Sequence, residues 1–136
     1  MTSPYPTQAI EEFLSEVNFN QDGLIPAIAQ QYDSGEILMM AWMNEEAIRI
    51  TLAEQVACYW TRSRNKLWRK GESSGQTQKL HNILLDCDGD TVILKVDQTG
   101  VACHTGRHNC FYKELTSEGI IEAHPVIISP DDLYKK

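Results

Sequence analysis

Several features of membrane, secreted and nucleic-acid-binding proteins are scarce or missing in this sequence. No apolar run approaches the roughly 20 residues that a membrane-spanning helix needs. Residues 1–13 contain neither a basic region nor an apolar core of the kind found in secretory signals. Twelve Lys and Arg stand against 19 Asp and Glu, and the net charge of −7 argues against a general affinity for nucleic acid. We therefore expect a cytoplasmic protein that binds neither membranes nor nucleic acids.

Cysteine and histidine are also scarce, with four of each in 136 residues. The cytosol keeps thiols reduced, so clustered cysteines there favour metal binding or catalysis over disulfides. The length suits one domain with its own hydrophobic core, and no repeat or low-complexity linker divides the chain. We expect a single domain over residues 1–136.

Hydrophobic spacing predicts more strands than helices. Apolar residues at helical intervals predict an amphipathic helix over residues 8–17, and Asn44 is a suitable N-cap for a second helix over 45–55. Short apolar runs bounded by turn residues predict strands. These runs are residues 24–43 around a turn at 33–35, 56–61, 79–97 around a turn near 88–89, and shorter segments at 98–104 and 109–115. Residues 117–130 read as an irregular or edge-strand tail, and the fold class is α+β with mainly antiparallel sheet.

The stretch "CHTGRHNC" places two of the four cysteines, Cys103 and Cys110, around two histidines. Their spacing is wider than the knuckle of a structural zinc finger. A third cysteine, Cys87, lies in "DCDGD", whereas Cys58 lies in the apolar run "VACYWT" and is expected in the core. Three thiolates remain, and a catalytic zinc ion uses three protein ligands because its fourth position stays open.

The stretch "DCDGD" also contains three carboxylates. In extended backbone, Asp86, Asp88 and Asp90 share one face, and Cys87 points to the other. Such crowded carboxylates repel one another unless a hard cation such as Mg²⁺ or Ca²⁺ neutralises them. An EF-hand does not fit, because Thr91 stands where that loop needs glycine. A solvated acidic turn remains the alternative.

A basic stretch interrupts the acidic sequence at "YWTRSRNKLWRKGESSGQTQKLH". Five of the 12 Lys and Arg fall between residues 62 and 70, and the glycine- and serine-rich loop that follows could cradle phosphate through its N–H and hydroxyl groups. We expect an anionic, phosphate-bearing substrate, although a solvated basic face is the alternative. The candidate substrate contacts are Arg62, Arg64, Lys66, Trp68, Lys70, Glu72, Ser74, Gly75 and His81.

Three motifs in this order, "WTRSRNKLWRKGESSGQTQ", "DCDGD" and "CHTGRHNCF", resemble the phosphoribosyl-AMP cyclohydrolase family, which catalyses the third step of histidine biosynthesis. The resemblance extends from about Gly35 to Tyr112. It implies an intertwined cytosolic homodimer that hydrolyses the N1–C6 bond of phosphoribosyl-AMP. Some members are fused to the pyrophosphohydrolase of the preceding step. Since this chain ends soon after the motifs, we expect that activity to be absent.

The resemblance also implies two metal sites. Carried over by position, Cys87, Cys103 and Cys110 are the zinc ligands, shared between subunits. By the same transfer, Asp86, Asp88 and Asp90 are the magnesium ligands.

The expected reaction begins with attack of water on C6 of the purine. A zinc centre with three thiolates has a net charge of −1 and should acidify water less than a site with three imidazoles does. A nearby base is therefore useful, and His104, next to Cys103, is the candidate catalytic residue. A loop histidine that only serves structure is the alternative.

Two other classes of protein could use parts of this pattern. The first is a zinc-stabilised nucleotide- or RNA-binding module without catalysis, in which Cys58 completes a closed site of four cysteines. Such a module gives no reason for three neighbouring aspartates. The second is a zinc nucleobase deaminase, which needs the strings H-x-E and P-C-x-x-C, and neither string is present.

Overall fold

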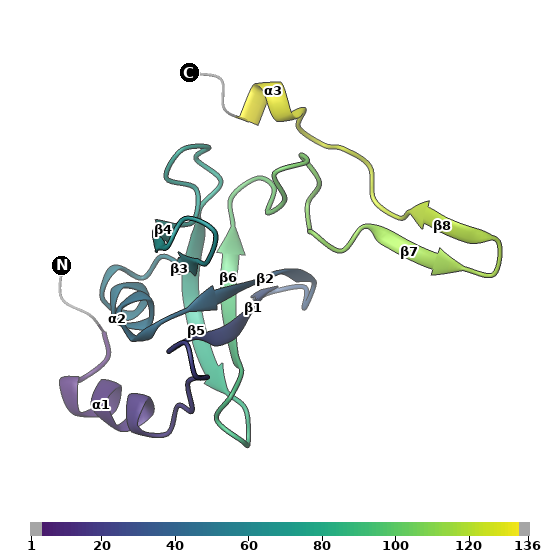
Figure 1. Ribbon diagram of the computed structural model, residues 1–136. Coiled ribbons are helices and arrows are strands. Elements are labelled where there is room, and N and C mark those ends of the chain that lie inside the picture. Colours follow the sequence, from purple (N-terminus) through teal and green to yellow (C-terminus); the bar gives the residue numbers. More distant parts are fainter. Residues whose placement is uncertain (1–3, 134–136) are drawn as a thin grey trace.

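A six-stranded sheet forms the body of the protein in the computed structural model, which describes residues 4–133 (Figure 1). Residues 1–3 and 134–136 of the expected domain lie outside this range. In spatial order the strands are β4 (Lys66–Arg69), β3 (Cys58–Thr61), β2 (Ile37–Met43), β1 (Ile25–Gln31), β6 (Val92–Gln98) and β5 (Gln78–Leu85). All neighbours pair antiparallel except β1 and β6, which are parallel. The prediction of a mixed α and β fold with mainly antiparallel sheet is confirmed.

Two helices accompany this sheet, α1 (Thr7–Ser15) and α2 (Glu45–Glu54). The Asn44 side chain accepts a hydrogen bond from the Ala47 N–H at 2.8 Å, so the predicted N-cap of α2 is confirmed. Helix α2 packs its buried side chains, among them Ile48 and Leu52, into the core over β2 and β3. Among the described residues, no helix is long and apolar enough to cross a membrane.

The core fills one side of the sheet with residues from several strands and α2. Its largest fully buried side chains include Tyr59, Leu38, Ile48, Leu52 and Leu94. Cys58 on β3 has no exposed surface, as expected for a cysteine in the core. The predicted hairpins at 24–43 and 79–97 are also present, as β1–β2 and β5–β6.

The strand predicted at residues 98–104 is wrong. Strand β6 ends at Gln98, and residues 99–112 form turns and bends, because their backbone groups bond within the segment or to neighbouring loops. The segment predicted at 109–115 begins as strand only at Lys113. Strand β7 (Lys113–Thr116) then pairs with β8 (Gly119–Glu122), and the short helix α3 (Pro130–Leu133) follows.

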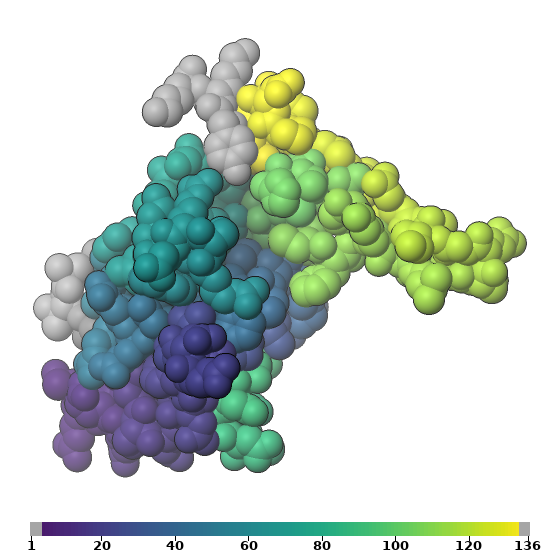
Figure 2. All heavy atoms as spheres, in the orientation of Figure 1, coloured from purple at the N-terminus to yellow at the C-terminus, as the bar shows by residue number. Residues whose placement is uncertain are grey.

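The hairpin β7–β8 projects from the body as an arm (Figures 1 and 2). Two of its apolar side chains are largely exposed, Leu115 at 80% and Ile120 at 72%. A two-stranded hairpin alone is at best marginally stable in water, so an arm of this kind needs contacts beyond its own pair of strands.

Candidate active site

Residues 103–110, here called the thiol loop, bring two of the three candidate zinc ligands together. The loop closes on itself through a backbone hydrogen bond of 3.0 Å from Ala102 N–H to His108 O. A second bond, 2.7 Å from Cys110 N–H to Leu38 O, fixes its end on β2. The Cys103 and Cys110 side chains line the same cavity, and the Cys103 Sγ lies 3.0 Å from the Thr105 hydroxyl. The thiol loop therefore brings Cys103 and Cys110 to one site.

The surroundings of Cys110 oppose its ionisation. Cys110 is exposed as a residue, yet desolvation of its thiol raises the pKa of Cys110 to about 12. The neighbouring Cys103 adds to the increase, whereas the Lys70 ammonium acts in the opposite direction. The thiol is thus protonated near neutral pH in the metal-free protein. A metal ion that binds Cys110 must displace this proton, so binding releases protons into solution.

Two adjoining cavities lie beside the thiols. The smaller, about 130 Å³, is lined by both thiols and by Trp68, Lys70, Ser74 and His104 among others. The larger, about 760 Å³, shares the last four residues and adds Arg64 and Glu72. We call the two together the site cavity. It gathers the candidate base, the thiol pair and five of the predicted substrate contacts, Arg64, Trp68, Lys70, Glu72 and Ser74.

The other predicted substrate contacts lie elsewhere. The Arg62 guanidinium stacks 4.7 Å from the centre of the Trp42 ring, on the outer side of the sheet. His81 on β5 is exposed and stacks on Tyr32, with ring centres 3.8 Å apart. Lys66 and Gly75 are exposed, and neither residue lines the site cavity. Their roles in substrate binding stay predictions.

His104 is exposed on the thiol loop and lines both parts of the site cavity. Within residues 4–133 its imidazole makes no hydrogen bond. His108 differs, because its Nδ1 lies 2.8 Å from a Glu36 carboxylate oxygen. Asn109 donates to the other oxygen at 2.6 Å. Glu36 therefore binds the thiol loop to the β1–β2 turn. Of the two histidines in this loop, His104 is the one whose nitrogens make no hydrogen bond within residues 4–133.

Three glutamines, of which Gln78 and Gln98 are buried, connect the two segments that form the cavity wall. The Gln76 side chain accepts a hydrogen bond from Val101 N–H at 2.9 Å, and Gln78 donates to Gln98 at 2.9 Å. The Gln98 amide in turn donates to the Thr99 carbonyl at 2.8 Å. Sequence analysis did not identify this network, because glutamine is usually exposed and its pattern here carries no signal.

Arg107 is a second residue that the sequence analysis did not single out. It is 8% exposed, and its Nε donates to the His124 carbonyl at 3.0 Å. Its guanidinium also pairs with Glu122 at 3.2 Å and lies 3.9 Å from the centre of the Tyr112 ring. Arg107 therefore fastens the β7–β8 arm and the tail to the thiol loop.

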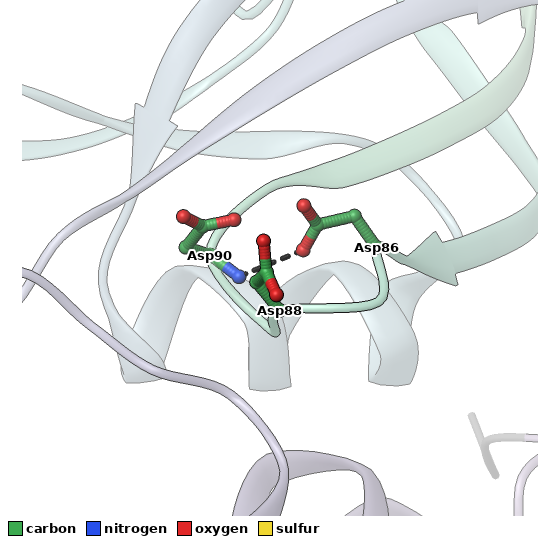
Figure 3. Close-up of side chains that lie close together, drawn as sticks. All are labelled: Asp86, Asp88 and Asp90. Carbon is green, nitrogen blue, oxygen red and sulfur yellow. Dashed lines mark hydrogen bonds between the residues drawn. The ribbon is translucent and has the colours of Figure 1, made fainter.

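The three candidate magnesium ligands gather on the β5–β6 turn (Figure 3). One ligand oxygen from each of Asp86, Asp88 and Asp90 lies within 4.8 Å of the others, and all three residues are exposed. Although desolvation raises the pKa of Asp86, hydrogen bonds from the N–H groups of Asp90 and Thr91 lower it overall. The nearby Asp86 raises the pKa of Asp90. This all-oxygen set fits a hard cation.

Cys87, the third candidate zinc ligand, is exposed on this same turn and lies far from the thiol loop. The turn precedes β6 and the thiol loop follows it, so they occupy opposite ends of that strand (Figure 1). Seven strand residues span roughly 23 Å. Among the described residues, only the three aspartates form a group of three or more potential ligands. One chain therefore does not bring its three cysteines together.

Comparison with known proteins gives a consistent result. A family model described as Phosphoribosyl-AMP cyclohydrolase matches residues 39–112. Proteins named Phosphoribosyl-AMP cyclohydrolase from Paramagnetospirillum magneticum and Rhodospirillum rubrum are each 62% identical to this chain. The first match covers 90% of this chain and 93% of the relative, and the second covers 87% and 83%. A protein of the same name from Pseudomonas syringae pv. syringae is 54% identical over 92% of this chain and 97% of the relative.

Gly106, in the middle of the thiol loop, should be essential for the docking of the tail. Its φ of +86° favours glycine, and a Cβ there would run into the Ile128 carbonyl oxygen. We expect Gly106→Ala to lower the free energy of unfolding by more than the roughly 1–2 kcal/mol that left-handed backbone alone costs. Gly23 is the matched control, with φ of +76° and open space around its Cβ position. Equal losses for the two variants in urea denaturation would contradict a role for this close contact.

Proposed function

This chain belongs to the phosphoribosyl-AMP cyclohydrolase family, and we propose that its site cavity is where the N1–C6 bond of phosphoribosyl-AMP is hydrolysed. One observation carries the assignment of the reaction to this cavity. The thiol pair, His104 and five of the basic-stretch and loop residues expected to contact substrate line two adjoining cavities that share four residues. The family membership makes the protein a hydrolase of histidine biosynthesis.

The reaction requires both protons of the attacking water to leave its oxygen. Water adds to C6 of the purine ring, the N1–C6 bond breaks, and the water oxygen becomes the carbonyl oxygen of the product carboxamide. One proton goes to N1, and the other goes to the exocyclic nitrogen, an imine in the neutral substrate, which stays on the product as the carboxamide NH2. We assign the proton transfer to His104, which takes the proton from the attacking water and returns it to N1. Its free nitrogens at the cavity support this role. A zinc ion bound at the thiols would supply Lewis acidity beside it.

The zinc site of this proposal is built from two subunits. Cys103 and Cys110 of one chain form a pair, and Cys87 of the same chain lies at the other end of β6. A three-thiolate site therefore takes its third ligand from a second copy, and a two-fold dimer would form two such sites by the same exchange. The exposed apolar side chains of the β7–β8 arm, including Leu115 and Ile120, offer surface for this second copy.

In this arrangement the proposed magnesium ligands lie next to Cys87 and approach the partner subunit together with it. Asp86 and Asp88 flank that cysteine in the sequence, so a Cys87 that reaches the partner's thiol loop carries the aspartate cluster toward the partner's cavity. We propose that Asp86, Asp88 and Asp90 hold Mg²⁺, where it would help to orient the substrate. The cytoplasm is the compartment in which we place this enzyme, and phosphoribosyl-AMP, not nucleic acid, is its partner.

The alternative of a zinc-stabilised binding module is not favoured. It needs Cys58 as a fourth thiol, and Cys58 has no exposed surface on β3. Within the part of the chain that the structure describes, Cys58 also belongs to no group of three potential metal ligands. The remaining function is the enzymatic one.

Purified protein should convert phosphoribosyl-AMP to the ring-opened aminoimidazole carboxamide. The absorbance of this product measures the rate of the reaction. His104→Asn should lower kcat by about 10²–10⁴, as removal of a general acid–base group does, and should leave zinc content unchanged. A variant with full zinc and wild-type kcat would remove His104 from the mechanism, and a variant without zinc would make it a ligand.

Cys87→Ser, Cys103→Ser and Cys110→Ser should each lose zinc and activity, whereas Cys58→Ser should keep both. Zinc content measured by metal analysis checks the ligands. Sharing between subunits has its own test, because a mixed dimer of Cys87→Ser and Cys103→Ser chains contains one intact three-thiol site. Refolding the two inactive proteins together should therefore restore part of the zinc and activity. No recovery from mixed dimers, or an active monomer in light scattering, would contradict the shared site.

Arg64 and Arg62 should differ in their effect on substrate binding. Arg64 lines the site cavity, while Arg62 stacks on Trp42. A charge-assisted contact contributes about 1.5–3 kcal/mol, so Arg64→Ala should raise KM by roughly tenfold to a hundredfold. Arg62→Ala serves as the matched change and should have a smaller effect. Steady-state kinetics decide the matter, and an equal or larger effect at Arg62 would mean that the substrate approaches from the other side of the sheet.

A further inference from the structure

Lys70 differs from every other basic residue of the stretch at 62–70. Its residue is 7% exposed, whereas Lys66 and Arg64 are exposed. Arg69 is neutralised by Glu54 through two hydrogen bonds of 3.0 and 2.8 Å. The Lys70 Nζ instead donates to the Ala102 carbonyl at 2.9 Å, beside the thiol loop. The composition of the stretch predicted a basic surface, but the Lys70 ammonium is buried inside the protein.

The position of this ammonium relative to the thiols is specific. Lys70 is the one Lys or Arg among the residues that line the smaller cavity, and the cavity wall also includes apolar Met39 and Val101. Burial lowers the pKa of Lys70, and the neighbouring Cys110 and Cys103 act in the opposite direction. An ammonium has three N–H donors, and within residues 4–133 the Ala102 carbonyl is its one hydrogen-bond partner.

A buried ammonium needs compensation. Transfer of a charge into an apolar wall is unfavourable unless an opposite charge or hydrogen bonds offset it. Lys70 has one carbonyl and the face of the Trp68 ring, whose centre lies 5.5 Å from Nζ, and neither partner carries a negative charge. The same wall disfavours two adjacent thiolates, which repel each other. Thiolates at Cys103 and Cys110 would supply the missing negative charge for Lys70, and Lys70 would supply positive charge for them.

We propose that Lys70 is the fixed countercharge of the zinc–thiolate centre, and not a ligand of the substrate phosphate. Three thiolates and one divalent ion have a net charge of −1, and the ammonium brings the group to neutrality. Lys70 is thus a positioning residue that favours zinc at the thiol pair. This inference rests on the three-thiolate site of the proposed function.

The affinity for zinc tests the inference without any measurement of activity. Lys70→Met removes the charge and keeps an unbranched side chain of similar length. In full-length dimeric protein at one pH and ionic strength, competition with a coloured chelator should show zinc binding weakened roughly tenfold to a hundredfold. Lys79→Met is the control, because Lys79 is exposed on β5, where solvent screens its charge. Its zinc affinity should equal that of the wild type.

A second variant separates the charge from the hydrogen bond. Lys70→Gln removes the charge and retains an N–H donor for the Ala102 carbonyl, so it should weaken zinc binding as Lys70→Met does. Recovery of wild-type affinity in Lys70→Gln would show that only the hydrogen bond matters, and would overturn the proposal. The urea midpoint of the metal-free protein should not fall in Lys70→Met, because removal of an uncompensated buried ammonium is not destabilising. A lower midpoint with zinc affinity preserved would assign Lys70 to the fold alone.

Substrate kinetics provide the remaining comparison. If Lys70 instead binds the substrate phosphate, zinc-loaded Lys70→Met should have a raised KM and an unchanged affinity for zinc. That result would also overturn the proposal. Failure of the proposed function is distinguishable from these outcomes. If the wild-type protein itself bound no zinc with Cys103 and Cys110 intact, the three-thiolate site would fail before Lys70 was considered.

Discussion

Strand β6 imposes the constraint on which the proposed chemistry depends, because it separates two groups of ligands by its full length. The aspartate turn with Cys87 precedes the strand, and the thiol loop follows it. The strand lies between β1 and β5 in the sheet, so neither end can move toward the other without loss of two ladders of hydrogen bonds. In the proposed three-thiolate site the metal centre would therefore be assembled between chains, and catalysis would then depend on association.

Contacts with four parts of the chain hold the thiol loop in place: β2, the β1–β2 turn, the tail and the β7–β8 arm. Leu38 on β2 and Glu36 in the β1–β2 turn fix one side. The tail packs over Gly106, and Arg107 binds the arm. Within residues 4–133, no buried side-chain nitrogen or oxygen lacks a hydrogen-bond partner. In surroundings of low dielectric an unpaired polar group is costly, so this dense pairing gives the loop one well-defined conformation in which to present two thiols.

Charge in this acidic protein is distributed more unevenly than the total of −7 suggests. Arg69 pairs with Glu54, Arg49 with Glu11 and Glu45, and Arg107 with Glu122. The basic stretch consequently offers fewer free cations than its composition indicates. Arg64 faces the larger cavity, while Lys70 lies inside the wall beside the thiols. Under the two proposals, this short stretch would serve two electrostatic purposes, attraction of an anionic substrate and compensation of a thiolate centre.

The sequence by itself determined the family, the two main helices, the two long hairpins and the residue types of the candidate site, because these depend on motifs and on short-range hydrophobic spacing. The cap at Asn44 and the burial of Cys58 were likewise predictable from their neighbours in the chain. Only the tertiary structure decided that β1 pairs parallel with β6, that Lys70 is buried and that Cys87 lies apart from the thiol pair. These features depend on contacts between residues distant in the sequence, and local spacing carries no information about which distant groups will meet.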